Sequence, residues 1–384
     1  MKKPAIYMDN AATSFPKPES VYRAVEEMMR TRGGNPGRSG HRMALAANRV
    51  IFDARESLAN LFSIKDSSRL IFTSNATEAL NLAIKGIVGE GSHVITSGIE
   101  HSSITRPLSA LQKKGVQVSK IDCDKDGCFH AEEIKKKIKN NTSLIALTHA
   151  SNVIGTIEPV AGIGALARER NVPFLLDAAQ TAGTMPIDVN ELKIDLLAAA
   201  GHKSLLGMQG TGILYIAPHI NLTPLKEGGT GAGISGDEQP LELPDRFEAG
   251  TMNTPGIAGL GAGARFILEE GFPAIRQKEM SLIKRLIEGL AGEPGITIYG
   301  SLHAEERVSL LSFNIKGIDS SEVAFRLDDE YGIMTRGGLH CAADAHKFLG
   351  TYPGGCVRLS PGYFNTMEEI DAVIAAVREI AGGK

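Results

Sequence analysis

Seven short apolar runs, most of them separated by amphipathic stretches, constrain the fold of this chain more than any other feature. Strands that are apolar throughout and are joined through helices are typical of a mostly parallel sheet covered on both faces. The last two runs are joined only by residues 202–211, so they are expected to pair antiparallel. The runs lie at residues 70–74, 93–98, 116–121, 143–149, 173–179, 195–201 and 212–216. The sequence therefore predicts an α/β fold with a large domain around a mostly parallel, mixed seven-stranded sheet.

The pattern of apolar and polar residues changes from about residue 265 onward. A long helical pattern over 263–292 leads into two apolar runs and a final helix over 366–381, with Thr366 as its expected N-cap. This pattern predicts a smaller C-terminal α+β domain. Residues 218–262 are rich in Gly and Pro and poor in periodicity, and so long a loop in a compact domain is usually functional. The expected division is a large domain over 18–262 and a small domain formed by 1–17 plus 263–384.

Composition argues against a nucleic-acid-binding, membrane-spanning or disulfide-rich protein. The formal net charge is −3 and no basic cluster is interleaved with aromatic residues, so no nucleic-acid partner is expected. The chain contains no apolar run long enough to span a membrane, and its start lacks the apolar core of a signal peptide. The expected location is the cytoplasm. The four cysteines fit neither a disulfide framework nor a common zinc spacing, which predicts free thiols.

Two charged residues follow apolar strands, where a bare charge is costly. Lys203 opens a glycine-rich loop after 195–201; burial lowers the pKa of a lysine and makes it nucleophilic, as a Schiff base requires. Asp177 follows the apolar residues of the run at 173–179 and could hold a cofactor pyridinium nitrogen protonated, with Gln180 three residues further on. Taken singly, a lysine that snorkels at the sheet edge and an aspartate that caps a helix are equally good interpretations.

Three more strand ends carry polar groups suited to a phosphorylated aromatic ring. A strand turns into a helix at Ala76–Thr77, where free backbone N–H groups and a hydroxyl can bind a phosphate. His101 could stack on a ring, although a single histidine at a strand end is more often structural. Asn152 could donate to a ring oxygen, although it also fits an ordinary turn.

One cysteine lies in a setting that suits a nucleophile. Two glycines precede His340 and Cys341, which predicts a mobile loop, and His340 and Arg336 are expected to favour the thiolate of Cys341. The acidic turn around Cys123 and Cys128 disfavours a thiolate there. Cys356 starts an apolar run and is expected to serve only in packing.

The order and spacing of these motifs resemble a known family. The matching segments include "YMDNAATSFPKP", "FTSNATEALNLA", "EHSS", "THASNVIGT", "LLDAAQTAG", "GHKSLLGMQGTGILY", "RFEAGTMNTPG", "RGGLHCA" and "VRLSPGYFNT". The chain resembles class V aminotransferase-fold cysteine desulfurases, specifically the SufS-like (selenocysteine lyase-like) group with a short catalytic loop. The resemblance implies a pyridoxal 5′-phosphate enzyme of fold type I, working as a homodimer with a shared active site and using no metal.

The resemblance also implies a role for each candidate residue. Lys203 carries the cofactor, Asp177 pairs with its ring nitrogen and His101 stacks on its ring and assists catalysis. Cofactor contacts are further expected from Ala76, Thr77, Asn152, Gln180 and His202, and from Thr251 across the dimer; substrate contacts are expected from Arg358, Asn152 and Arg336.

The implied reaction converts L-cysteine to L-alanine and leaves the sulfur as a persulfide on Cys341, for transfer to an acceptor protein or thiol. Selenocysteine lyase activity on L-selenocysteine, another class V reaction such as transamination, and a protein with a degenerate site remain alternatives. Two positions depart from the family: Ala200 replaces a hydroxyl residue expected to touch phosphate, and Ala343 replaces a proline after the cysteine loop. The first departure predicts weaker retention of the cofactor.

Overall fold

The structure is a computed structural model, and it describes residues 5–37, 39–231 and 237–383. Seven strands form the large sheet, in the order β2-β8-β7-β6-β5-β3-β4. β8 pairs antiparallel with both neighbours and the other pairings are parallel, which confirms the predicted mixed sheet. The strands are β2 (Leu70–Thr73), β3 (His93–Ser97), β4 (Gln117–Ile121), β5 (Thr142–Thr148), β6 (Phe174–Asp177), β7 (Leu196–Ala200) and β8 (Gly212–Ile216).

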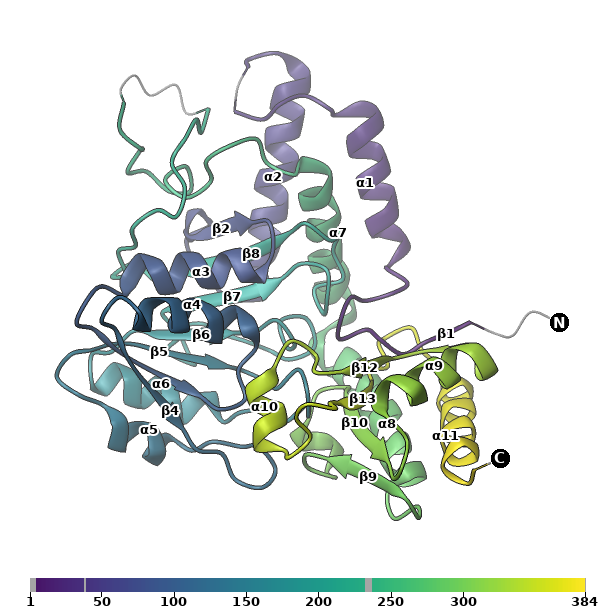
Figure 1. The fold of residues 1–384 in the computed structure, drawn as a ribbon. Coiled ribbons are helices and arrows are strands. Elements are labelled where there is room, and N and C mark those ends of the chain that lie inside the picture. The colour runs from purple at the N-terminus through teal and green to yellow at the C-terminus, as the bar shows by residue number, and fades with distance from the viewer. Residues whose placement is uncertain (1–4, 38, 232–236, 384) are drawn as a thin grey trace.

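Both faces of the large sheet are buried, as the continuous apolar runs predict. Successive residues of one strand enter different cores: Leu175 and Leu196 pack with helices on one face, and Leu176 and Leu197 pack with helices on the other. The first face carries α3 (Ala76–Ile87) and α4 (Ser102–Gln112), and the second carries α2 (Arg42–Leu61), α5 (Ala131–Lys137), α6 (Val160–Glu169) and α7 (Thr254–Glu270). α1 (Glu19–Thr31) packs alongside α7 (Figure 1).

A second, antiparallel sheet lies beside the first (Figure 1). Its strands, in spatial order, are β12 (Arg336–Gly338), β13 (Cys356–Leu359), β10 (Leu311–Ile315) and β9 (Ile296–Tyr299). The helices of this part are α8 (Phe272–Leu290), α9 (Ser320–Tyr331), α10 (Ala343–Phe348) and α11 (Met367–Ala381). Thr366 caps α11 in a reciprocal capping box with Glu369, as predicted.

The N-terminal segment joins this second part of the molecule. β1 (Ile6–Tyr7) pairs in parallel with β11 (Ile333–Met334), and Ile6 and Met8 enter the core formed by α8, α9, α11 and β10. This packing supports the proposed grouping of 1–17 with the C-terminal residues.

The helical pattern of the middle segment differs from the prediction in two ways. α7 begins at Thr254, inside the stretch expected to be irregular, and Gly271 (φ 78°) separates it from α8. Small residues let this helix approach its neighbours: a Cβ at Gly261 would lie 2.6 Å from the Cβ of Ala54, and one at Gly263 would lie 2.3 Å from the carbonyl oxygen of Leu205. Tertiary packing therefore overrides the low helix propensity of glycine. Because α7 packs on the large sheet as far as Ile267, we propose Gly271 as the domain boundary in place of residue 262.

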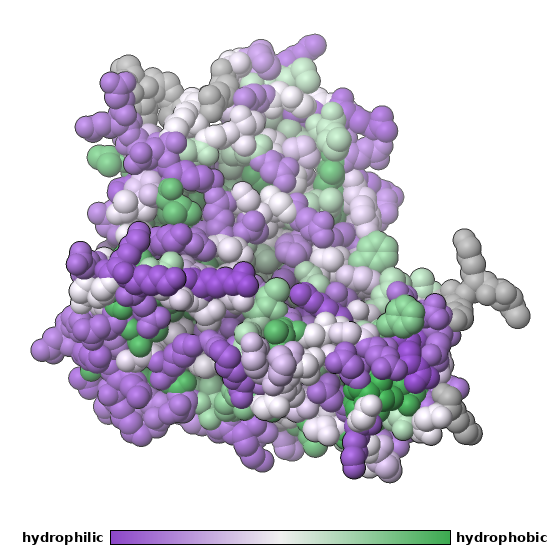
Figure 2. All heavy atoms as spheres, viewed as in Figure 1, coloured by the Kyte–Doolittle hydropathy of each residue, from purple (hydrophilic) through white to green (hydrophobic). Residues whose placement is uncertain are grey.

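Among the described residues, no helix is both long enough and apolar enough to cross a bilayer. Hydrophilic residues predominate on the face shown in Figure 2, and apolar residues form small separate groups there.

Candidate active site

Most of the predicted site residues line one pocket at the carboxyl edge of the large sheet. The pocket has a volume of about 230 Å³. It forms there because the carboxyl ends of parallel strands meet at one edge, and the loops that follow them converge. The predicted residues that line it are Ala76, Thr77, His101, Asn152, Asp177, Gln180, His202, Lys203, Arg336 and Arg358. Residues from both parts of the chain therefore meet in one site.

Lys203 and Asp177 form the electrostatic centre of the pocket. Burial lowers the pKa of Lys203 to about 8, against the opposing effect of the Asp177 carboxylate. Burial raises the pKa of Asp177, which is 4% exposed, while the N–H of Ala179 donates to its Oδ1 at 3.0 Å and Lys203 opposes the rise. A larger fraction of Lys203 is thus the free amine near neutral pH than for an ordinary lysine.

One end of the pocket is suited to a phosphate. α3 starts there, with Asn75 as its N-cap; its Oδ1 accepts from the N–H of Glu78 at 2.9 Å. The hydroxyls of Thr77 and Ser103 lie 2.7 Å apart, and the buried Nδ1 of His202 has no hydrogen-bond partner among the described residues. Ser103, in the segment "EHSS", has no predicted role. Its side chain brings a hydroxyl to the pocket, whereas Ala200 has none.

His101 is the N-cap of α4, and its ring has a defined protonation state. Its Nδ1 accepts from the N–H of Ser103 at 3.1 Å, so the neutral ring carries its proton on Nε2. Burial, followed by the nearby cations Lys203 and Arg336, lowers the pKa of His101 to about 4. The ring is therefore uncharged near neutral pH, as a stacking partner for an aromatic ring can be.

Arg358 is held in place by Asp9, a residue with no predicted role. Its Nη2 donates to Oδ1 of Asp9 at 2.8 Å, and its Nη1 donates to the carbonyl of Asn152 at 3.0 Å. The side chain is 1% exposed, and its Nε is buried without a partner in the described part of the chain. Asp9 belongs to the segment "YMDNAATSFPKP", but Arg358 is 349 residues away, so no local pattern indicates their contact.

Cys341 is exposed at the rim of the pocket, where Arg336 contacts its sulfur. The Nη2 of Arg336 donates to the Cys341 sulfur at 3.6 Å. The backbone N–H of Ser102 donates to the Cys341 carbonyl at 2.8 Å, and Nδ2 of Asn152 donates to the carbonyl of His340 at 2.7 Å. The loop that carries Cys341 is therefore held by hydrogen bonds to the residues that follow β3 and β5 of the large sheet.

The expectation that His340 assists the Cys341 thiolate is wrong. The His340 ring is only 3% exposed, points inward and lies with Nε2 3.0 Å from the carbonyl of Cys356. Burial lowers its pKa to about 2, so the ring carries no charge that could favour a neighbouring thiolate. Cys123 and Cys128 match their predictions, because burial raises their pKa to about 12, with Glu158 the next contributor. Cys356 is fully buried.

Thr251 lies outside this pocket. It is exposed and lines a separate hollow with Glu78 and Lys226, so its expected contact across a dimer remains a prediction. Residues 232–236 of the Gly- and Pro-rich stretch 218–262 lie outside the described residues.

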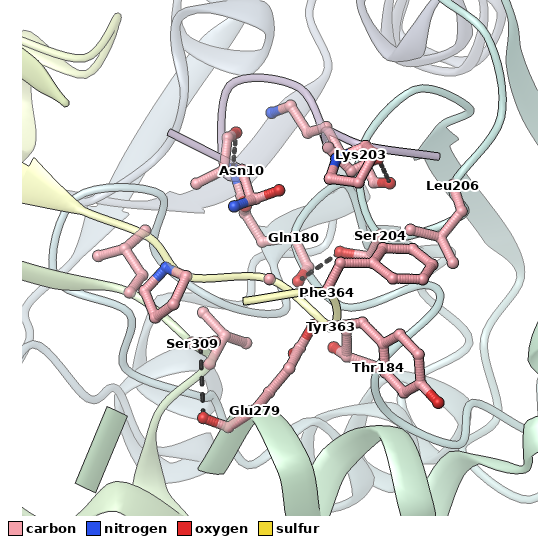
Figure 3. A pocket seen from close by; sticks show the side chains of 17 residues that line it. Asn10, Gln180, Thr184, Lys203, Ser204, Leu206, Glu279, Ser309, Tyr363 and Phe364 are labelled. Carbon is pink, nitrogen blue, oxygen red and sulfur yellow. Dashed lines mark hydrogen bonds between the residues drawn. The ribbon is translucent and has the colours of Figure 1, made fainter. Parts of the chain in front are cut away.

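A second cavity adjoins the first at Lys203 and Gln180, and Figure 3 shows its lining. Glu279 of α8 extends into it from the opposite side. Glu279 is 8% exposed, and burial raises the pKa of its carboxyl group to about 8, opposed by Arg276. The cavity therefore holds a carboxylic acid that is mostly neutral at pH 7.

Because of Glu279, we expect the free energy of unfolding to fall as the pH rises toward alkaline values. The folded pKa of about 8 exceeds the ordinary value of 4.5, so the stabilising effect of the neutral acid is complete below about pH 4.5 and is lost as the pH rises through 8. Glu279→Gln is expected to remove up to about 1.4 kcal/mol per pH unit of this dependence. Urea unfolding at roughly pH 5.5, 7 and 9 measures this change in the free energy of unfolding with pH. The exposed Glu269→Gln is the control; equal slopes in both variants would contradict the prediction.

Comparison with known proteins agrees with this geometry. The family model described as "Aminotransferase class-V" matches residues 6–373. A protein of Methanothermobacter thermautotrophicus named "Probable cysteine desulfurase" is 37% identical, over 98% of this chain and 95% of its own. "Cysteine desulfurase IscS" of Methanosarcina thermophila is 33% identical, over 98% of this chain and 92% of its own.

Solved structures give the same result. The apo structure of a cysteine desulfurase from Thermococcus onnurineus superposes with a TM-score of 0.92 at 34% identity, covering 99% of this chain and 95% of that one. The cysteine desulfurase CsdA from Escherichia coli gives a TM-score of 0.88 at 28% identity, covering 99% and 95%. By its sequence, its fold and its relatives, this chain belongs to the class V aminotransferase family.

Proposed function

We propose that this protein is a pyridoxal-phosphate-dependent cysteine desulfurase that holds sulfur as a persulfide on Cys341. The observation that carries the proposal is an exposed thiol paired with Arg336 at the rim of a pocket that contains Lys203 and Asp177. An aminotransferase needs no such thiol. The names of the relatives support the same activity.

The polar groups that line the pocket suit pyridoxal phosphate. The start of α3, Thr77, Ser103 and the unpartnered Nδ1 of His202 form an anion-binding end, and Asp177 offers a carboxylate at the other side. Lys203 is the amine that would attach the cofactor aldehyde. When bound, the cofactor supplies an electron sink that stabilises negative charge at the substrate Cα.

The residues of this chain then carry the remaining steps. Arg358 binds the substrate carboxylate, and the free amine of Lys203 takes the Cα proton onto Nζ. The Cys341 thiolate attacks the substrate sulfur; the S–S bond forms as the C–S bond breaks, and the carbon fragment leaves as alanine after protonation. L-Cysteine and the Cys341 thiol thus give L-alanine and a Cys341 persulfide, with no net oxidation. We propose that a second copy completes the site through Thr251.

The test is a single turnover of the cofactor-loaded protein with L-cysteine, without added thiol. We expect one alanine per site and a mass increase of one sulfur on the peptide that contains Cys341. Alanine without the added sulfur would instead indicate a lyase that does not use the thiol, and L-selenocysteine would then be the substrate to compare. Pyruvate or a keto acid without alanine would indicate another reaction of the family.

Ala200→Ser is expected to tighten cofactor binding. Ala200 lines the phosphate end of the pocket, and a serine there would add a hydroxyl that can donate to a charged oxygen. Such a hydrogen bond contributes about 1.5 kcal/mol or more, which is roughly tenfold in affinity. Equilibrium dialysis of pyridoxal phosphate measures the change, with Ala199→Ser, one residue earlier in β7, as the control. An affinity that is unchanged or weaker would show that Ser103 and Thr77 already fill this role.

A further inference from the structure

Three buried side chains that the proposed reaction does not use lie close together near Cys341, and one of them, His340, also lines the active-site pocket. They are His340, His346 of α10 and Cys356 of β13, with exposed fractions of 3%, 0% and 0%. One ring nitrogen of each histidine and the Cys356 sulfur lie within 4.8 Å of one another. The two imidazole rings lie 5.7 Å apart between centroids, inclined at 43°.

The hydrogen bonds of the two rings fix a nitrogen lone pair on His340 and allow one on His346. Nε2 of His340 lies 3.0 Å from the Cys356 carbonyl, which can only accept, so Nε2 carries the proton and Nδ1 does not. Nδ1 of His346 lies 2.8 Å from Oγ1 of Thr351, whose hydroxyl is directed at the His346 carbonyl. In that arrangement Nδ1 of His346 donates to Thr351, and Nε2 is the free nitrogen.

Both free nitrogens lack a hydrogen-bond partner in the described part of the chain. His340 Nδ1 and His346 Nε2 are fully buried and unpaired, which is costly for polar atoms. The Leu339 carbonyl lies close enough to the His346 ring to act on its pKa. In the other tautomer, Nε2 of His346 donates to that carbonyl and Nδ1 accepts from the Thr351 hydroxyl at the same 2.8 Å, so only the 3.4 Å contact of the hydroxyl with the His346 carbonyl is lost. A cation bound at Nε2 of His346 would replace the contact with Leu339.

We propose that His340, His346 and Cys356 form a buried binding site for one thiophilic cation, Zn²⁺ or Cu⁺. Neutral imidazole and thiolate are the ligands that these ions prefer, whereas Mg²⁺ and Ca²⁺ need oxygen ligands, which the three residues do not offer. The carbonyl of Cys356 and the hydroxyl of Thr351 orient the two rings in the way that outer contacts of metal ligands do.

Binding is a simple exchange of a proton for the cation. The Cys356 thiol loses one proton to solvent as its sulfur binds the ion, and the two neutral histidines lose none. The site connects β13 and α10 to the residue next to Cys341, so an occupied site would fix one end of the loop that carries the thiol.

The experiment uses the cofactor-loaded protein after treatment with a chelator. Co²⁺ is titrated first because thiolate ligation gives a sulfur-to-cobalt charge-transfer band; Zn²⁺, Cu⁺ and Mg²⁺ are then added in competition. We expect one Co²⁺ per chain, displacement by Zn²⁺ or Cu⁺ but not by Mg²⁺, and one proton released. Cys356→Ser and His346→Gln are each expected to weaken Zn²⁺ binding more than about a hundredfold, beyond the effect of an outer contact.

Matched controls separate this site from other thiols. Asp124, Cys128 and His130 form a more exposed group with similar spacing, so Cys128→Ser must keep the band, and so must Cys341→Ser. A wild type without the band, a band that persists in Cys356→Ser, or its loss in Cys128→Ser would overturn the proposal. Circular dichroism confirms folding of each variant, and His346→Gln decides the matter if Cys356→Ser does not fold. The readout is independent of desulfurase turnover.

Discussion

Replacing Cys341 with alanine is expected to lower sulfur transfer from L-cysteine by more than about a thousandfold, while the bound cofactor keeps its absorption band. The thiol is exposed at the pocket rim, and Arg336 lies within 3.6 Å of its sulfur. No other cysteine can replace it: burial holds the thiol pKa of Cys123 and Cys128 at about 12, and Cys356 is fully buried. The measurement is alanine formed in a single turnover.

Cys128→Ala is the control for this experiment and should retain full turnover. Arg336→Met is an informative partner, because it removes the cation beside the sulfur and leaves the thiol in place. We expect it to slow alanine formation from L-cysteine, because the contact between Nη2 of Arg336 and the Cys341 sulfur is lost. Full turnover of L-cysteine by Cys341→Ala would show that the nucleophile is assigned incorrectly. A variant that keeps activity only toward L-selenocysteine would move the assignment to a selenocysteine lyase.

The large sheet could be predicted from the sequence because its physical cause is local. Buried strands such as β6 and β7 are apolar on both faces, so each appears in the sequence as an uninterrupted run. Asp177 and Lys203 stood out for the same reason, since a charge directly after such a run requires a partner. The short 202–211 connection was enough to predict the antiparallel pairing of β7 and β8.

The features that escaped prediction depend on contacts between distant segments. Asp9 and Arg358 are 349 residues apart, and no local pattern connects them. The start of α7 was missed because its glycines are poor helix formers, and only the close approach of Ala54 and Leu205 explains their presence. His340 was assigned to the thiolate by its position in the chain, but its ring turns away from Cys341 toward Cys356.

Lys203→Ala is expected to abolish the lysine-linked absorption band of the cofactor and to lower alanine formation by a further factor of about 10²–10⁴ from the lost base. Burial, which lowers the pKa of Lys203 to about 8, makes the amine available for both tasks. Lys17 is the matched control, because burial also lowers its pKa to about 8 and its Nζ donates to the His202 carbonyl at 2.9 Å, next to Lys203. Lys17→Ala should keep the band, since Lys17 is tied to that carbonyl and to Ser14. Added methylamine should restore part of the activity of Lys203→Ala, because a small amine can take up the proton in place of Nζ. Loss of the band in Lys17→Ala together with its survival in Lys203→Ala would transfer the cofactor linkage to Lys17.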